Sequence, residues 1–409
     1  MNKVLIIGYV WPEPNSSAAG SRMMQLIHFF LDQGAEITFA SAAVVSTHMS
    51  DIESLGVKKV TIELNNESFD KFIAELNPNI VLFDRFMIEE QFGWRVAKHC
   101  PSALRLLDTE DLHCLREARH KALKADRSVS TEDLNSEMAI REVASILRCD
   151  LSLMVSNYEI TLLTEHYGVS KALLMHLPFM LPPINKPNFM PFEQRQGYLA
   201  IGNFRHLPNW DAVLYLKQTL WPLIRKRQPS AELFIYGAYP PPKATQLHNP
   251  KQGFHIKGWA EDAHEVMSQA RLCLAPLRFG AGIKGKLIDA MQTGTPNICS
   301  SIAAESMHAD LPWSGNICDE PEAFADQAVA LYGDSEKWHQ AQANGVEIIN
   351  KLYSETLLSK RLEARIDELQ SNLKQHRNNN FIGSMLQHHT MQSIKYMAQW
   401  IEAKNKNKT

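Results

Sequence analysis

The chain has 409 residues, which exceeds the length of one ordinary domain and favours two. Hydrophobic residues make up 45% and charged residues 21%, the composition of a soluble globular protein. The formal net charge of −3 argues against a nucleic-acid-binding surface, and no apolar run is long enough to cross a bilayer.

The N-terminus and the cysteines both favour a cytoplasmic protein. Residues 1–8 have neither the long apolar stretch nor the cleavage site of a signal peptide, and they are typical of a first strand. The six cysteines form no C-x-x-C pair and match no zinc-site spacing, so we expect reduced thiols, no catalytic cysteine and no bound metal. They are Cys100, Cys114, Cys149, Cys273, Cys299 and Cys318.

The first half of the chain alternates short apolar runs with helical patterns. The strands are expected at 4–7, 36–40, 57–64, 80–83, 104–107 and 151–155, and the helices at 21–33, 69–76, 132–148 and 158–167. Such alternation predicts parallel strands in a doubly wound sheet. Prolines then concentrate within residues 177–192 and indicate a connection between domains.

A second alternation begins at residue 198. Its strands are expected at 198–202, 231–236, 254–257, 272–277, 297–299 and 316–318, and its helices at 209–226, 262–270, 321–331, 335–351 and 356–374. The predicted fold class is therefore α/β, with two doubly wound, Rossmann-like domains that face a central cleft. The expected divisions are a first domain at 1–180, a linker at 181–196, a second domain at 197–355, a helix at 356–376 returning to the first domain, and a tail at 377–409.

The tail differs in character from the rest of the chain. Its apolar side chains fall close to one helical face, and lysines follow near its end. Two interpretations are open. In the first, the tail is a helix docked on the first domain or a partly ordered segment. In the second, it is an amphipathic helix that makes peripheral contact with the inner face of a membrane.

The segment from Pro276 to Pro296 is the most informative part of the sequence. It follows an apolar strand, breaks at Gly280 and Gly282, and is expected to open a helix around Ile283. Helix N-termini present unpaired N–H groups and the positive end of a dipole, so they attract anions. The glycines would let the backbone approach a phosphate closely.

Charged side chains accompany this glycine-rich loop. Lys284 and Lys286 supply positive charge, and Asp289 follows one turn later. A loop that attracts phosphate, with a carboxylate nearby for hydroxyl groups, suits a nucleotide diphosphate attached to a sugar.

Arg205 lies between the strand that ends at Gly202 and a helix for which Asn209 is the expected cap. In a doubly wound domain this position is close to Lys286. Two cations around a diphosphate would stabilise the charge that builds on it as it leaves. The alternative is that Arg205 pairs with a local carboxylate.

An acidic loop follows a strand of the first domain. Four acidic residues, one histidine and one arginine lie within residues 108–117. Carboxylates and imidazole can hold sugar hydroxyls or assist proton transfer, which makes Asp108, Asp111 and His113 candidates. The alternative is a helix start capped by Asp108 or Asp111. Gly20 lies in another loop of small residues that could approach a ligand, and Arg22 beside it is expected to be a surface residue.

Several motifs are absent. Gly8 and Gly20 are too far apart for G-x-G-x-x-G after the first strand, which argues against a nicotinamide enzyme. No D-x-D triplet provides ligands for a metal that bridges a diphosphate. No P-loop and no esterase nucleophile elbow occur.

Residues from about 198 to 310 closely resemble the donor domain of retaining GT-B glycosyltransferases of the group 1 (GT4-like) family. The matching segments are IGNFRHLPNWDA at 201–212, GWAED at 258–262, APLRFGAGIKGKLIDA at 275–290 and Gly294-Thr295-Pro296. The first domain resembles the acceptor domain of this family more loosely, through the loops at 11–22 and 108–113. The tail lies outside the resemblance.

The resemblance implies a metal-independent, retaining glycosyltransferase of the hexosyltransferase type. It would move a sugar from a UDP- or GDP-linked donor to a glycan, lipid-linked or other glycoconjugate acceptor, in cell-surface polysaccharide biosynthesis, without a cofactor. The implied residues are Arg205 and Lys286 for catalysis; Gly202, Asn203, Gly280, Gly282, Ile283, Lys284 and Asp289 for the donor; and Gly20, Asp108, Asp111 and His113 on the acceptor side.

The sequence departs from the family pattern at three places. Asp289 stands where a glutamate more often binds the nucleotide ribose, and Gly280-Ala281 stands where a glutamate usually faces the donor sugar. Asn203 replaces a common arginine, for which Arg205 is the expected substitute. Two alternatives therefore stay open: a non-catalytic GT-B subunit that binds a nucleotide sugar, or another GT-B enzyme such as a nucleotide-sugar epimerase.

Overall fold

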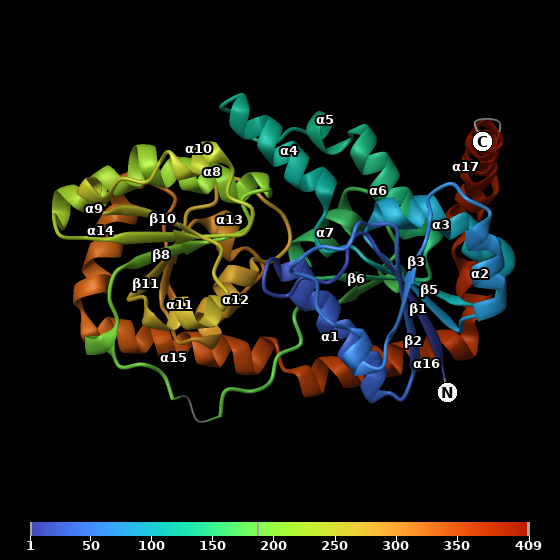
Figure 1. Cartoon of the computed structure of the whole chain (residues 1–409), viewed down its shortest axis with the longest axis horizontal. Helices are drawn as coiled ribbons and strands as arrows, with labels where there is room; N and C mark the ends of the chain where they lie inside the picture. The colour runs from blue at the N-terminus through green and yellow to red at the C-terminus, as the bar shows by residue number, and fades with distance from the viewer. Residues whose placement is uncertain (1, 186–187, 407–409) are drawn as a thin grey trace.

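Two parallel sheets form the framework of the molecule. The computed structural model describes residues 2–185 and 188–406, so residues 186–187 of the expected linker and 407–409 of the tail lie outside it. The sheets belong to separate domains that lie side by side, each sheet with helices packed against it (Figure 1). The predicted α/β architecture with two Rossmann-like domains is confirmed.

The first sheet has seven parallel strands in the order β3-β2-β1-β4-β5-β6-β7. The strands are β1 (Lys3–Gly8), β2 (Glu36–Ser41), β3 (Lys58–Thr61), β4 (Ile80–Asp84), β5 (Leu104–Asp108), β6 (Leu151–Met154) and β7 (Leu174–His176). The helices are α1 (Ala18–Asp32), α2 (Ser68–Leu76), α3 (Phe86–His99), α4 (His113–Lys124), α5 (Thr131–Leu134), α6 (Glu137–Arg148) and α7 (Asn157–Glu165). The central strands are buried on both faces, which explains their continuous apolar runs.

The second sheet has six parallel strands in the order β10-β9-β8-β11-β12-β13. The strands are β8 (Tyr198–Ile201), β9 (Leu233–Tyr236), β10 (Phe254–Gly258), β11 (Leu272–Ala275), β12 (Asn297–Cys299) and β13 (Gly315–Ile317). The helices are α8 (Leu207–Tyr215), α9 (Trp221–Arg227), α10 (Pro242–Thr245), α11 (Ala263–Gln269), α12 (Gly285–Gln292), α13 (Ser301–Ala304), α14 (Pro321–Gly333) and α15 (Ser335–Leu352).

Each sheet reverses its strand order once, between β1 and β4 in the first domain and between β8 and β11 in the second. Loops that leave neighbouring strands at such a point diverge and open a crevice at the carboxyl ends of the strands. The loops after β8 and β11 carry most of the predicted site residues. The topology therefore brings segments that are distant in sequence to one cleft.

The two C-terminal helices return to the first domain. Four residues of α16 (Glu355–Asn379) join its apolar core: Leu358, Leu362, Ile366 and Leu369. Helix α17 (Phe381–Lys406) packs on α3 and α6, at the far end of that domain from the second one (Figure 1). The Gln387 amide donates to the Arg148 carbonyl at 3.0 Å, and Glu402 pairs with Arg95. The tail is thus a docked helix.

Two further observations concern the whole chain. Within the described residues, no helix is both long and apolar enough to cross a membrane. The six cysteines are all free thiols, five of them buried, as expected.

Candidate active site

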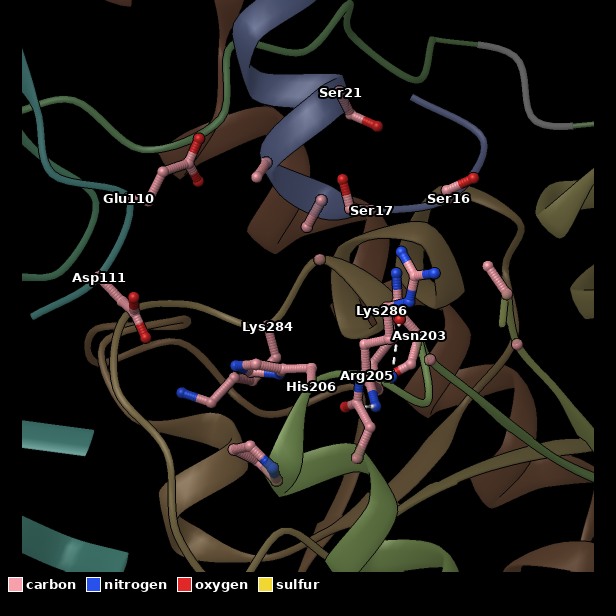
Figure 2. A pocket seen from close by; sticks show the side chains of 18 of the residues that line it. Ser16, Ser17, Ser21, Glu110, Asp111, Asn203, Arg205, His206, Lys284 and Lys286 are labelled. Atoms are coloured by element: carbon pink, nitrogen blue, oxygen red, sulfur yellow. Dashed lines mark hydrogen bonds between the residues drawn. The ribbon is translucent and has the colours of Figure 1, made fainter. Parts of the chain in front are cut away.

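A cavity of about 770 Å³ lies between the two domains at the strand ends. Most of the predicted residues line it: Gly202, Asn203, Arg205, Gly280, Ile283, Lys284, Lys286 and Asp289 from the second domain, and Asp111 and His113 from the first. Gly20, Asp108 and Gly282 are not part of its lining. Figure 2 shows Ser17, Ser21 and Glu110 on one side of the cavity and Asn203, Arg205 and Lys286 on the other.

Lys286 lies in the first turn of α12 and points back toward the loop after β8. Its Nζ donates to Asn209 Oδ1 at 2.7 Å. A Cβ on Gly202 would lie 2.8 Å from that Nζ and 2.6 Å from Asn209 Nδ2, so a larger residue there would displace both side chains. Burial lowers the pKa of Lys286 to about 8. The expectation that Asn209 caps a helix is wrong, because α8 begins at Leu207 and the Asn209 side chain holds Lys286 instead.

Lys284 occupies the N-cap position of α12, which begins at Gly285, slightly later than expected. Its Nζ donates to the carbonyls of Ala281 at 3.1 Å and Gly282 at 2.6 Å. Burial lowers the pKa of Lys284 to about 8 as well. Lys284 thus shapes the glycine-rich loop and adds positive charge beside the positive end of the α12 dipole.

Arg205 stacks on an aromatic ring. Its guanidinium lies 3.7 Å from the centroid of the Tyr239 ring, and its backbone N–H donates to Asn203 Oδ1 at 2.9 Å. The Tyr239 hydroxyl donates to Glu13 Oε2 of the first domain at 3.1 Å. In the part of the chain that the structure describes, Arg205 forms no salt bridge, so the alternative of a local carboxylate partner has no support.

Asp289 also lines the cavity, together with Lys284, Lys286 and Arg205. Its side chain is 36% exposed, and its Oδ1 lies 3.5 Å from Nε2 of His264. The hydrogen bond to Asp289 raises the pKa of His264, although burial opposes it. Asp289 therefore faces solvent with a carboxylate available for hydroxyl groups.

Gly282 is a contact between the domains. Its φ is +63°, and a Cβ there would lie 2.8 Å from the Cβ of Asp111. Its N–H donates to Glu159 Oε1 at 2.8 Å. Gly282 was expected to approach a phosphate. In the structure it instead lets the glycine-rich loop pack against the acidic loop of the first domain.

We predict that Gly282→Ala lowers turnover at this site by at least about tenfold, because the added methyl group forces the two loops apart. Gly34→Ala is the matched control. Gly34 has φ +69° with nothing within 4 Å of an added Cβ, so it shares the backbone strain without the clash. Backbone strain should cost both variants about 1–2 kcal/mol of stability in thermal unfolding, and Gly282→Ala should lose more because of its clash with Asp111. Equal activity of the two variants would contradict this role.

Asp108 and Arg22 form a buried ion pair beneath the cavity wall. Arg22 is 1% exposed and Asp108 is fully buried, with Arg22 Nη2 at 2.8 Å from Asp108 Oδ1. The expectation that Arg22 is a surface residue is wrong, because α1 already begins at Ala18 and places Arg22 on its buried face. Gly20 also packs inward, where a Cβ would lie 2.3 Å from the Glu13 backbone. Gly20 and Asp108 therefore lie behind the cavity wall and do not face the cavity itself.

A carboxylate distant in sequence caps helix α4. The expected caps, Asp108 and Asp111, do not serve, since the N-cap Leu112 has no side-chain hydrogen bond. Glu142 accepts from the N–H groups of His113 at 3.0 Å and Cys114 at 2.9 Å instead. The Asp111 side chain is thereby left to face the cavity.

Asp111 is held as a carboxylate. Burial opposes its ionisation, but the charges of Arg116 and His113 outweigh it and hold the pKa of Asp111 below its usual range. His113 Nε2 lies 3.5 Å from Asp111 Oδ1, and burial lowers the pKa of His113 to about 4. At neutral pH the Asp111 carboxylate and the neutral imidazole of His113 therefore both face the cavity.

Several cavity residues were not predicted from the sequence, and His206 and Glu110 are two of them. Burial lowers the pKa of His206 to about 4, so its imidazole is neutral at neutral pH. His206 directly follows Arg205, in the segment between β8 and α8 that the sequence analysis had already identified as a candidate. Glu110 lies in the acidic loop, but nothing in its sequence context separates it from its acidic neighbours.

Two Rossmann-like domains that face a cleft define the GT-B fold. A family model described as glycosyl transferases group 1 matches residues 195–334, which contain most of the second domain. A comparison with curated proteins gives no match.

Solved structures with this fold cover nearly the whole chain. A point mutant of Staphylococcus aureus TarM, in complex with fondaparinux, alpha-GlcNAc-glycerol and UDP, has a TM-score of 0.67 at 9% identity, over 89% of this chain and 99% of its own. Sucrose-phosphate synthase from Thermosynechococcus elongatus has a TM-score of 0.66 at 15% identity, over 91% and 100%. Anabaena Alr3699/HepE, in complex with UDP and glucose, has a TM-score of 0.65 at 10% identity, over 90% of this chain and 100% of its own. At these identities the similarity is one of fold.

Proposed function

We propose that the protein is a group 1, GT4-like glycosyltransferase that moves a hexose from a nucleotide-diphosphate sugar to an acceptor, with retention and without a metal. The observation that carries the proposal is the placement of Lys286 and Arg205 beside the N-terminus of α12, on one wall of a cleft. Hydroxyl-binding groups lie on the opposite wall. The family-model match to residues 195–334 supports the same conclusion.

The donor diphosphate lies between Lys286 and Arg205 in this proposal. Asp289 binds the nucleotide ribose, and the backbone near Gly202 and Gly280 lines the rest of the donor site. The acceptor hydroxyl attacks the anomeric carbon from the face that the diphosphate leaves. The bond from that carbon to the diphosphate oxygen breaks with its electron pair, and the departing phosphate takes the hydroxyl proton. The cations stabilise the charge that develops on the diphosphate.

A thermal-shift screen tests donor binding. UDP-, GDP-, ADP- and CMP-sugars are compared with NAD, and we expect stabilisation by a UDP- or GDP-sugar and none by NAD. UDP is the first choice because solved structures of similar fold contain it. Stabilisation by NAD alone, or by none of these compounds, would overturn the proposal.

A non-catalytic subunit is the second candidate. The observation that favours it is the pair Gly280-Ala281, which places no carboxylate where the glycine-rich loop faces the cavity. Such a subunit would be stabilised by a nucleotide sugar without consuming it. An epimerase would instead convert the sugar with no acceptor present, and product analysis separates the three outcomes.

The acceptor is proposed to be a glycan or lipid-linked molecule of cell-surface polysaccharide synthesis, reached from the cytoplasm. The outward face of α17 suits a peripheral position at a membrane. Among the side chains that the structure describes on this helix, six large apolar ones are exposed: Phe381, Ile382, Met385, Tyr396, Met397 and Trp400. Lysines near the C-terminal end of the helix add positive charge for anionic headgroups.

We predict that the double substitution Phe381→Ser and Trp400→Ser lowers co-sedimentation with phosphatidylglycerol vesicles by severalfold, because it removes two exposed aromatic anchors. The docked face of α17 is untouched, so stability should hold. Leu357→Ser is the control, since Leu357 is 59% exposed on α16. Vesicle binding that is absent in the wild type, or equal in both variants, would exclude the membrane contact.

A further inference from the structure

Glu110 is a cavity residue with an unusual backbone and no partner for one of its oxygens. It lies two residues after the end of β5, and its φ of +63° lies in the left-handed region that non-glycine residues rarely adopt. Its Oε1 is buried from solvent and has no hydrogen-bond partner among the described residues. A side chain kept in such a conformation beside a cavity indicates a functional demand on its position.

The charges around Glu110 do not balance if it is ionised. Asp84 at the end of β4 and Asp108 at the end of β5 face it, together with Arg22 and Arg85. Arg22 is bound to Asp108 at 2.8 Å, and Arg85 Nε lies 3.6 Å from Asp84 Oδ1. Each arginine is thus matched by another carboxylate. Burial, followed by the repulsion from Asp108, raises the pKa of Glu110 to about 8, although Arg85 opposes this.

The position of Glu110 matches the nucleophile side of the proposed reaction. Glu110 lies across the cavity from Lys286 and Arg205, which are assigned to the diphosphate (Figure 2). An ionised Glu110 would add a further negative charge to those of Asp111 and Asp289 in this cleft and would repel that diphosphate. A neutral carboxylic acid avoids the repulsion and still has a carbonyl oxygen that accepts a hydrogen bond.

We propose that Glu110, in its protonated form, binds the incoming oxygen nucleophile, which is the acceptor hydroxyl or, without an acceptor, water. Its carbonyl oxygen accepts a hydrogen bond from the O–H group and orients the oxygen toward the anomeric carbon. As the bond between the anomeric carbon and the diphosphate oxygen breaks, the O–H group leaves its hydrogen bond to Glu110, and its proton passes to the departing phosphate. The inference rests on the proposed function and adds a residue on the acceptor side.

The test uses the full-length protein and the nucleotide sugar that stabilises it most, with water as the acceptor and release of the nucleotide diphosphate as the signal. Glu110→Gln retains a carbonyl oxygen and should keep turnover within about twofold at pH 7. Glu110→Ala should lower kcat at least about tenfold with an unchanged KM for the donor. Glu110→Asn accepts the positive φ but is one methylene shorter, so it should resemble the alanine variant.

The pH profile separates this role from a structural one. Wild-type Glu110 ionises as the pH rises through its pKa of about 8, whereas glutamine does not. The ratio of Glu110→Gln to wild-type turnover should therefore rise about tenfold between pH 7 and pH 9. A flat ratio, or a glutamine variant as inactive as the alanine variant, would overturn the proposal. A wild type that releases no nucleotide diphosphate from any donor would instead overturn the proposed function itself.

Discussion

Replacing Lys286 by alanine should lower donor turnover by at least about tenfold. The charge-assisted contact that the ammonium group makes with the diphosphate contributes about 1.5–3 kcal/mol. Because the charge on the diphosphate grows as the bond breaks, the loss should appear in kcat. The assay is release of the nucleotide diphosphate under saturating donor.

Lys337→Ala is a suitable control for this variant, since Lys337 is 74% exposed on α15, remote from the cavity. Lys286→Arg tests the charge itself. The pKa of Lys286 is about 8, below its ordinary value of 10.5, so the wild type loses this charge as the pH rises through 8. Arginine keeps its charge, and the ratio of Lys286→Arg to wild-type turnover should rise above pH 8. Unchanged turnover in Lys286→Ala would refute the role assigned to Lys286.

Replacing Arg22 by alanine should cost about 3–5 kcal/mol of stability, because it leaves the Asp108 carboxylate buried without its partner. Arg22 donates to both oxygens of Asp108 and, through Nη1, to the Leu177 carbonyl at 2.7 Å. It therefore joins α1, β5 and the segment that leaves the first domain. The measurement is thermal or urea unfolding of the full chain.

The control for Arg22 is a solvated pair of similar geometry. Arg141 binds Glu90 through two nitrogens, but its side chain is 51% exposed. Arg141→Ala should cost less than about 1 kcal/mol. If Arg22→Ala destabilised the protein no more than Arg141→Ala, the ion pair with Asp108 would not support the first domain as inferred.

All the strands except β7 were predicted, because most are short apolar runs that both faces of a parallel sheet bury. Helix α3 was not predicted, and the start of helix α4 was predicted only as an alternative, with Asp108 or Asp111 as its cap. The reasons lie elsewhere in the chain. Gly93 interrupts the pattern of α3, and it is needed because a Cβ there would lie 2.5 Å from Oε1 of Glu89. Glu89 is fixed by Arg148 on α6. Helix α4 is capped by Glu142, 29 residues after His113. A local sequence pattern cannot predict partners that lie so far away in the chain.

The donor side of the site was easier to predict than the acceptor side. Lys286 and Asp289 belong to one strand–loop–helix unit, so their spacing alone places them at the cleft. Arg22 and Asp108 are 86 residues apart, and their pairing appears only once α1 packs beneath β5. The contact of Gly282 with Asp111 depends further on how the two domains face each other. Local units are readable from sequence, whereas contacts across the cleft are not.

Release of nucleotide diphosphate from a UDP- or GDP-sugar by the purified protein, with EDTA present, is the most direct test of the proposed activity. We predict steady release that EDTA does not abolish and that Lys286→Ala reduces at least about tenfold. Donor binding without any release, with or without added acceptors, would show a binding subunit rather than an enzyme. Release that stops in EDTA and returns with a divalent cation would contradict the metal-independent mechanism.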